Sequence, residues 1–231
     1  MVFYAFAKYA TQENVWRYLL AAPDADTIDE WWRAVSAPSK KDLGYERLSP
    51  DFYTYVKGYP YDAAPEFTSR IVFTLLHDRD SRILSLFPHQ DRTDVRSGQT
   101  FFVRSKSKPD LFWWVGSTGT LTASTKHRSR FRFDIEDEDD GTVIVGKSPV
   151  SVFSIGEKQS VAINNSDERC TSVEPDGIYK NKFYYGELKG SFLSSQWGKY
   201  GELSQECDHP DHSFQISMVE KGHGEEWELV K

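Results

Sequence analysis

Residues 101–146 read FFVRSKSKPDLFWWVGSTGTLTASTKHRSRFRFDIEDEDDGTVIVG, and this stretch decides the fold class of the chain. It contains five short extended runs separated by turn-forming residues: 101–104, 111–115, 120–124, 130–135 and 142–145. In the run 130–135, large apolar side chains alternate with charged ones, and this period of two indicates a strand with one buried face. The pair Asp140-Gly141 predicts a tight hairpin before the last run, because glycine adopts positive φ at little cost. We therefore expect an antiparallel β meander at the centre of the fold.

The N-terminal part predicts a short edge strand in roughly the first 15 residues and two helices, over 12–22 and 27–38. The second helix has the stronger pattern, with apolar side chains recurring on one face: Ile28, Trp31, Trp32 and Val35. A capping box of Thr27 and Glu30 begins it, and Pro38 ends it. Residues 39–66 are rich in tyrosine and proline and show no regular period, which is typical of a functional segment or one that wraps the surface.

The rest of the chain predicts further strands. Residues 67–76 resemble a buried strand paired with 81–87, and Gly156-Glu157 predicts a hairpin between two apolar runs. Alternation marks 213–219 as another strand, and 225–230 closes the chain. About twelve to fifteen strands at short intervals are typical of a sandwich or barrel.

We therefore expect a mainly β fold, an antiparallel two-sheet β-sandwich with short N-terminal helices. It forms a single domain, 1–231, in which an N-terminal helical and irregular part, 1–66, packs on an all-β body, 67–231. The alternative is a β-trefoil following an N-terminal extension, with equivalent strands starting at 129, 182 and 213. Their uneven spacing and the absence of a repeated Gln-x-Trp motif rank the trefoil second.

Composition limits the partners. The net charge of −7 and a pI near 5.4 argue against nucleic acid, because phosphate binding needs a basic surface. No apolar run approaches the ~20 residues that a membrane span needs. The first residues lack the basic and apolar regions of a signal peptide, so we expect a cytoplasmic protein or one exported without a classical signal peptide. Cys170 and Cys207 make no disulfide framework.

Three clusters of polar residues could carry chemistry, and for each the structural alternative is favoured. Residues 207–212, CDHPDH, contain possible zinc ligands but also resemble a polar turn. The acidic run 136–140 lacks the ligand spacing of a calcium loop and suits a charged hairpin tip. The basic stripe is an anion site or a solvated face; it comprises Lys126, His127, Arg128, Arg130 and Arg132. No common catalytic motif is present, so we expect no enzyme, no cofactor and no bound metal.

The aromatic side chains, 15% of the chain, exceed what a core of this size needs and favour carbohydrate binding. Pyranose C–H groups stack on aromatic rings, while neighbouring polar side chains bind the hydroxyls. Trp113 and Trp114 point to opposite faces of their strand, so they cannot fill the same core layer. Trp197 and Tyr200 lie in a glycine-rich loop, where large rings are hard to bury. The predicted ligand-binding residues are Trp197, Tyr200, Trp113, Asp110 and Arg104.

In style, the chain resembles the soluble, signal-less fruiting-body lectins of fungi. The resemblance covers residues 67–231 and rests on few cysteines, many Trp and Tyr, and segments such as FWWVGSTGTLTAS (112–124), SQWGKYGEL (195–203) and EEWELV (225–230). It implies non-catalytic recognition of glycans or glycoproteins by a homo-oligomer with a defensive role. Linked sites would gain avidity over single weak ones.

Two other functions remain open. The first is an enzyme acting on a sugar or small molecule in a β-barrel mouth, with His89, Asp91 and His127 as candidate catalytic residues. The second is a β-trefoil protease inhibitor that presents a rigid loop. Saturable glycan binding without turnover would distinguish a lectin from both.

Overall fold

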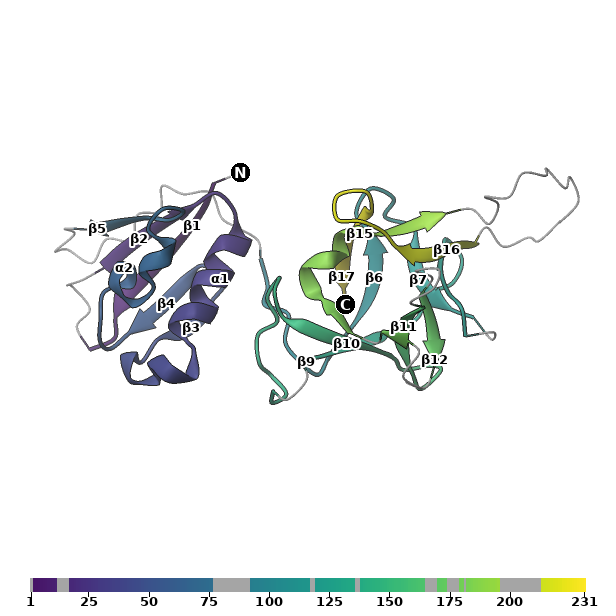
Figure 1. Cartoon of the computed structure of the whole chain (residues 1–231), viewed down its shortest axis with the longest axis horizontal. Coiled ribbons are helices and arrows are strands. Elements are labelled where there is room, and N and C mark those ends of the chain that lie inside the picture. The colour runs from purple at the N-terminus through teal and green to yellow at the C-terminus, as the bar shows by residue number, and fades with distance from the viewer. Residues whose placement is uncertain are drawn as a thin grey trace, which may run out of the picture. The chain divides into compact units, whose positions relative to one another are not determined.

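The computed structural model describes residues 2–11, 17–76, 92–116, 119–135, 138–164, 170–173, 179–180, 182–195 and 213–231. The chain divides into two compact units, Met1–Asp94 and Val95–Lys231, and each has its own hydrophobic core (Figure 1). We expected a single domain with an internal boundary after residue 66. The boundary falls later because residues 72–76 pair with the first sheet rather than with the second unit.

The first unit is a five-stranded sheet with helices. The strands are β1 (Phe3–Tyr9), β2 (Arg17–Ala22), β3 (Glu46–Ser49), β4 (Phe52–Tyr55) and β5 (Val72–Leu76). Their order is β3-β4-β1-β2-β5, in which β1 runs parallel to β4 and antiparallel to β2. The helical elements are α1 (Ala25–Val35), η1 (Pro38–Leu43), α2 (Pro60–Ala63) and η2 (Pro65–Phe67). Helix α1 lies against β1 and β2 (Figure 1).

The predicted helix over 27–38 is confirmed as α1, although its start differs. Asp24 is the N-cap, and its carboxylate accepts a hydrogen bond of 2.8 Å from the Thr27 amide. The predicted capping box is therefore wrong, because Thr27 already lies inside the helix. Trp31 is fully buried, and its ring meets that of Tyr53 edge-to-face at 5.2 Å. This contact fixes the helix on the sheet.

Other N-terminal predictions are corrected. Residues 17–22 form strand β2, not a helix: Tyr18, Leu20 and Ala22 are buried and alternate with less buried neighbours. Pairing with β1 overrides the helical propensity of this leucine- and alanine-rich segment. Strand β1 is central rather than at the edge. The irregular stretch 39–66 contains β3 and β4, and Val72 in β5 is 64% exposed, not buried. The predicted partner of β5, 81–87, lies outside the described residues.

The second unit contains a closed barrel of six strands. They are β6 (Gln99–Ser105), β7 (Phe112–Val115), β8 (Leu121–Ser124), β15 (Lys189–Ser195), β16 (Ser213–Met218) and β17 (Glu225–Val230). Their order is β6-β17-β15-β16-β8-β7, and a pairing between β7 and β6 closes the barrel. The mainly β prediction is confirmed, whereas a barrel stands where we expected a two-sheet sandwich. The runs starting at 129, 182 and 213 do not occupy equivalent places, since only the last contributes a barrel strand.

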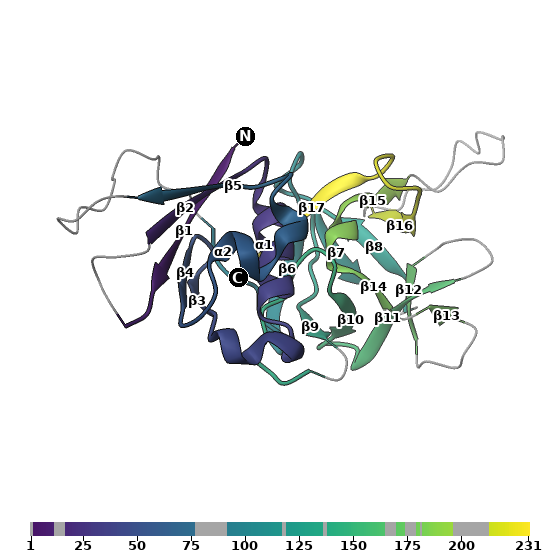
Figure 2. The same cartoon turned by 60° about the vertical axis from the view of Figure 1, so that its left-hand side comes forward.

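Further strands extend this sheet beyond β6. They are β9 (Phe131–Ile135), β10 (Pro149–Ser154), β11 (Gln159–Asn164), β12 (Cys170–Val173), β13 (Tyr179–Lys180) and β14 (Lys182–Tyr184), followed by η3 (Tyr185–Leu188). Figure 2 shows β9, β10 and β11 side by side. Residues 99–101 of β6 pair with β9, while 102–105 pair with β17. One strand thus joins the barrel to the extension.

Four of the five predicted runs are confirmed as strands, β6 to β9, but the meander holds only for the first three. Strand β9 pairs with β6 rather than with β8. The hairpin between β10 and β11 forms as predicted. The hairpin at Asp140-Gly141 is wrong, although Gly141 does adopt a φ of +92°. Val143 bridges to Arg96, and β9 pairs with β10 instead. The neighbouring strand offers β9 a longer register than the run 142–145 could.

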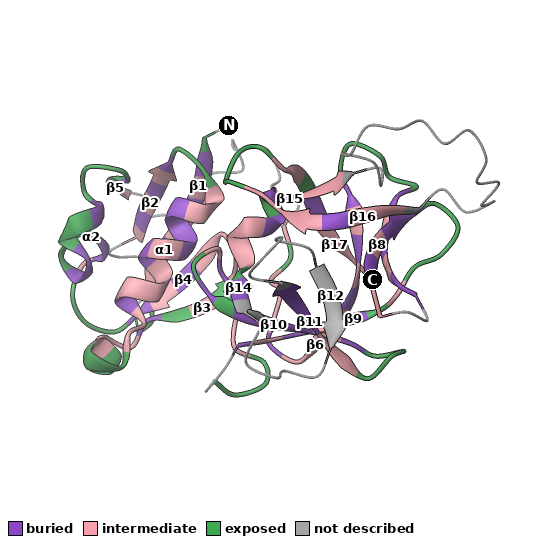
Figure 3. Cartoon of the chain, turned by 45° about the vertical axis from the view of Figure 1, so that its right-hand side comes forward, coloured by how far each residue is buried: buried purple, intermediate pink, exposed green. Residues whose placement is uncertain are grey.

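Trp113 occupies the centre of the second core. Its ring meets those of Phe131, Phe192 and Trp227 at centroid distances of 6.0, 5.3 and 5.7 Å. Buried and less buried side chains alternate along the surrounding strands (Figure 3). The inner face of the barrel is therefore filled by side chains, and an accessible site has to lie on its outer face or in its loops. Within the part of the chain described, no helix is long and apolar enough to cross a membrane.

Candidate functional site

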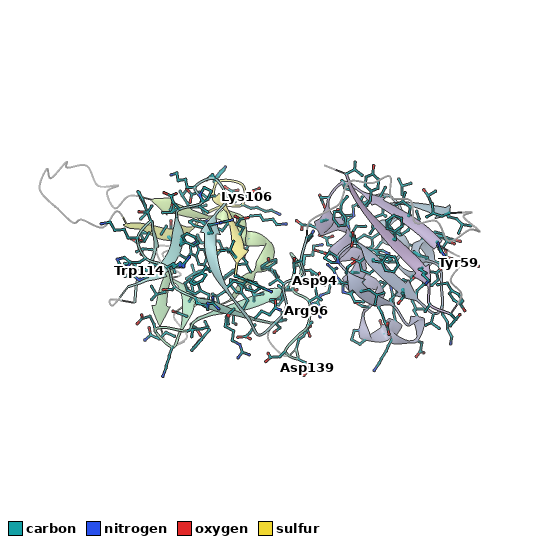
Figure 4. The ribbon with its side chains drawn as sticks, turned by 180° about the vertical axis from the view of Figure 1, so that it is seen from behind. Tyr59, Asp94, Arg96, Lys106, Trp114 and Asp139 are labelled. Atoms are coloured by element: carbon teal, nitrogen blue, oxygen red, sulfur yellow. The ribbon has the colours of Figure 1, made fainter. Side chains whose placement is uncertain are left out.

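A cluster of rings and cations lies on the outer face of the barrel. Strands β6 and β7 alternate strictly, so the residues between their buried ones point outward. We define the aromatic–arginine face as these outward residues together with the segment that follows β8: Phe102, Arg104, Phe112, Trp114, His127, Arg128 and Arg130. Trp114 lies at the periphery of the second unit (Figure 4).

Hydrogen bonds hold the segment 125–130 beside β7. The Ser124 hydroxyl oxygen accepts from the amides of Lys126 and His127, both at 3.2 Å. The Ser129 amide donates to the Trp113 carbonyl at 3.0 Å, and the Ser129 hydroxyl oxygen accepts from the Val115 amide at 3.0 Å. This segment therefore lies along β7, which places its cationic side chains over the rings of β6 and β7.

The guanidinium groups lie over the phenylalanine rings. Arg128 Cζ is 4.5 Å from the ring centroid of Phe102 and 5.6 Å from that of Phe112. Arg130 Cζ is 4.8 Å from the Phe102 centroid. The two phenylalanines themselves meet edge-to-face at 6.5 Å. Such cation–π contacts hold long, flexible side chains in a defined place.

A second stack lies on the same strand. The Trp114 and His127 rings are 4.9 Å apart at an angle of 29°. Gly116 leaves room for the tryptophan, because a Cβ at that position would lie 3.2 Å from Trp114 Cη2. His127 is exposed and Trp114 is half-buried, so this stack borders solvent.

Ion pairs divide the basic residues into two groups. Arg104 pairs with Glu228 at 2.6 Å, and Arg132 pairs with Asp134 at 2.7 Å and with Asp140 at 3.1 Å. Arg128 and Arg130 are exposed, and neither is paired with a carboxylate of any described residue. Among the described residues, these two guanidinium groups can therefore bind an anion without breaking an ion pair with a carboxylate.

The predicted ligand-binding residues lie in different places in the structure. Arg104 lies on the face, and Asp110 is exposed in the turn between β6 and β7. Trp113 is fully buried and has no ring surface for a ligand, whereas its neighbour Trp114 points outward. Trp197 and Tyr200 lie outside the described residues.

Sequence reasoning missed Phe102 and Phe112, and a signal for them exists. Trp113 shares its strand face with Leu111 and Val115, which are aliphatic and belong to a core. The opposite parity therefore belongs to Phe112 and Trp114. The arginines were recognised as a basic stripe, but their position over rings from another strand depends on tertiary pairing.

The other candidate sites receive no support. Among the residues that the structure covers, no group of three or more His, Cys, Asp or Glu side chains could hold a metal. The cluster 207–212 lies outside these residues, as do His89 and Asp91. Of the acidic run, 138–140 is described and exposed, and Asp140 pairs with Arg132.

A cluster of charged residues lies buried in the first unit. Arg47 bridges Asp29 at 2.9 Å and Asp94 at 2.7 Å, and it donates to the Tyr53 hydroxyl at 3.0 Å. Burial raises the pKa of Asp29, while Arg92 and Arg47 act in the opposite direction. The side chains of Arg47 and Asp29 are each 3% exposed. This network is closed to a ligand, and we assign it a structural role.

Comparisons of the chain with models of protein families, with curated proteins and with solved structures find no match. The aromatic–arginine face is therefore the basis for the function proposed below.

Proposed function

We propose that this protein is a non-catalytic carbohydrate-binding protein and that the aromatic–arginine face binds the glycan. The observation that carries the proposal is the grouping of Phe102, Phe112 and Trp114 on the outside of two paired strands, next to guanidinium donors. Each of the three residues is half-buried, so part of its surface borders solvent.

The chemistry of this face suits sugars. Aromatic rings accept the C–H groups of a pyranose, and guanidinium groups donate hydrogen bonds to its hydroxyls. The rings belong to strands of a closed barrel, so little ordering of the protein is needed on binding. A rigid, open surface favours recognition over catalysis, which usually needs a cleft that excludes water.

The resemblance to fungal fruiting-body lectins supports the same class. As in that family, we propose that the protein acts as a homo-oligomer on glycans or glycoproteins. A single open face of this kind binds weakly, and several linked copies would gain avidity.

A broad glycan array, followed by titration calorimetry with the best binder, tests the proposal. Trp114→Ala and Phe112→Ala should each weaken binding about tenfold, because each removes a ring of the binding surface. Leu48→Ala is the matched control, since Leu48 is an apolar residue of the first unit that is 60% exposed. Unchanged affinity in the control, together with affinity about tenfold lower in each ring variant, would support the proposal. An array without binders, or release of a product from a bound glycan, would contradict it.

A further inference from the structure

We infer that the aromatic–arginine face selects acidic glycans, whose sulfate or carboxylate groups bind to Arg128 and Arg130. The inference rests on the proposed function, since it names the ligand class of the same face. It adds that an anionic substituent, rather than the sugar ring alone, provides the selectivity.

The aromatic–arginine face presents positively charged side chains to solvent. Arg128 and Arg130 lie over Phe102 at 4.5 and 4.8 Å, and His127 stacks on Trp114 at 4.9 Å. The rings thus form a surface, and the two guanidinium groups and the His127 imidazole lie on it. A neutral sugar stacks best on a ring that is open on one side, and Phe102 is covered by two guanidinium groups. The ligand therefore meets guanidinium groups first.

Arg128 and Arg130 differ from the neighbouring arginines in their ion pairing. Two other arginines near this face are neutralised, because Arg104 pairs with Glu228 and Arg132 with Asp134. Arg128 and Arg130 have ring contacts but are paired with no carboxylate among the residues that the structure describes. A guanidinium offers two parallel N–H donors to a carboxylate or sulfate. Its position over a ring reduces the entropy lost when the anion binds.

The charges around the face favour a glycan over a nucleic acid as the ligand. The chain carries a net charge of −7, and Glu228 and Asp134 lie on strands bordering those of the face. These carboxylates already pair with Arg104 and Arg132, so few of the described cations near the face are left for a continuous polyphosphate, which the net charge also disfavours. Two neighbouring guanidinium groups match one or two isolated anionic substituents on a sugar chain. Acidic glycans combine such anionic groups with sugar rings that can stack on Trp114 and Phe112.

The experiment compares a sulfated glycosaminoglycan oligosaccharide, the same oligosaccharide after desulfation, a polyuronate and a neutral oligosaccharide, each titrated into the full chain. The sulfated or uronate probe should bind at least about tenfold tighter than the neutral ones. Added sodium chloride should weaken the binding, because exposed ion pairs are screened. Preference for the neutral probes, or affinity independent of salt, would overturn the inference.

Variants locate the anion. Arg128→Ala with Arg130→Ala should reduce affinity for the acidic probe about 100-fold, at roughly tenfold for each arginine. The double lysine variant, R128K/R130K, keeps both charges but loses the planar pair of donors. Its affinity should therefore lie between that of the wild type and that of the double alanine variant. The control, K41A/K57A, removes two exposed positive charges from the first unit. If the control loses as much affinity as the double alanine variant, the effect is one of net charge and the inference is wrong.

The outcomes distinguish this inference from the proposed function. Binding of neutral glycans alone, unaffected by the double alanine variant, would leave the proposed function standing and contradict the acidic selectivity. Binding of no glycan would contradict both. Equal or tighter binding of a single-stranded oligonucleotide would also contradict both, and would indicate a nucleic-acid site instead. Circular dichroism of each variant confirms that the fold is retained.

Discussion

The Nη1 atom of Arg47 lies 2.9 Å from Oδ1 of Asp29, and both side chains are almost fully excluded from water. The same guanidinium reaches Asp94 with Nη2, so one arginine neutralises two carboxylates inside the first unit. This arrangement joins β3 and α1 to the segment that ends the unit. It predicts what happens when the cation is removed.

Arg47→Met should lower the free energy of unfolding of the first unit by about 3 kcal/mol, because the buried Asp29 and Asp94 would both lose the Arg47 guanidinium while Asp29 kept its ion pair with Arg92. Urea denaturation measures the loss. Lys106→Ala breaks an exposed pair with Glu226 and should cost less than about 1 kcal/mol. Equal effects of the two variants would show that the Arg47 network carries no special stability.

Trp113 and Trp114 should respond oppositely to the same substitution. Trp113→Ala removes the central ring of the second core and should cost about 3–5 kcal/mol of unfolding free energy. Trp114→Ala should change stability much less, since its ring borders solvent, but should reduce glycan binding. Thermal unfolding and calorimetry on both variants separate the two roles. Loss of binding in a folded Trp113 variant with wild-type stability would contradict the assignment.

Much of the second unit was predictable from its sequence. The alternation in 130–135 identified β9 because burial on one face imposes a period of two, and Phe131, Phe133 and Ile135 are buried. The barrel as a whole was not predictable, because it also requires the pairing of β6 with β17, which lie far apart in the chain. The hairpin at Asp140-Gly141 was wrongly predicted for a related reason. A local turn signal does not reveal which strand lies next to β9.

The first unit was harder to predict. Residues 17–22 have the composition of a helix, and only pairing with β1 makes them a strand. The candidate site was half predictable. Its cations were visible as a stripe, whereas the contact of Arg128 with Phe102 and Phe112 joins segments that no local pattern connects.

Gly224 should tolerate no side chain. A Cβ there would lie 2.7 Å from the Phe192 amide nitrogen and 2.8 Å from the Gly190 carbonyl carbon, which are backbone atoms that cannot rotate away. Gly224→Ala should therefore push β15 and β17 apart and cost about 1–3 kcal/mol. Gly156→Ala is the control, because nothing lies within 4 Å of its added Cβ, and it should leave stability unchanged or slightly improved. Thermal unfolding of both variants checks the difference, and equal midpoints would contradict it.

The first unit should lose stability at alkaline pH because its tyrosines resist ionisation. Burial raises the pKa of Tyr18 from 10.0 to about 12, and the neighbouring Tyr61 and Tyr59 act in the same direction. Burial also raises the pKa of Tyr45 and Tyr55. A raised pKa in the folded state means that the folded chain holds the proton more tightly than the unfolded chain. The stabilisation is complete below about pH 10 and is lost as the pH rises towards about 12.

Ultraviolet absorbance of tyrosinate, recorded for the folded chain and for the chain in urea, measures this difference. The folded chain should ionise part of its tyrosines at higher pH than the unfolded chain does. Tyr18→Phe should reduce the loss of stability between about pH 10 and about 12, since one of the responsible hydroxyls is gone. Tyr184→Phe removes a hydroxyl from a residue of the second unit that is 55% exposed, and serves as the control. Coincident titration curves for the folded and unfolded chain would show that the tyrosine cluster is open to water, and would contradict the packing of Tyr18 against Tyr61.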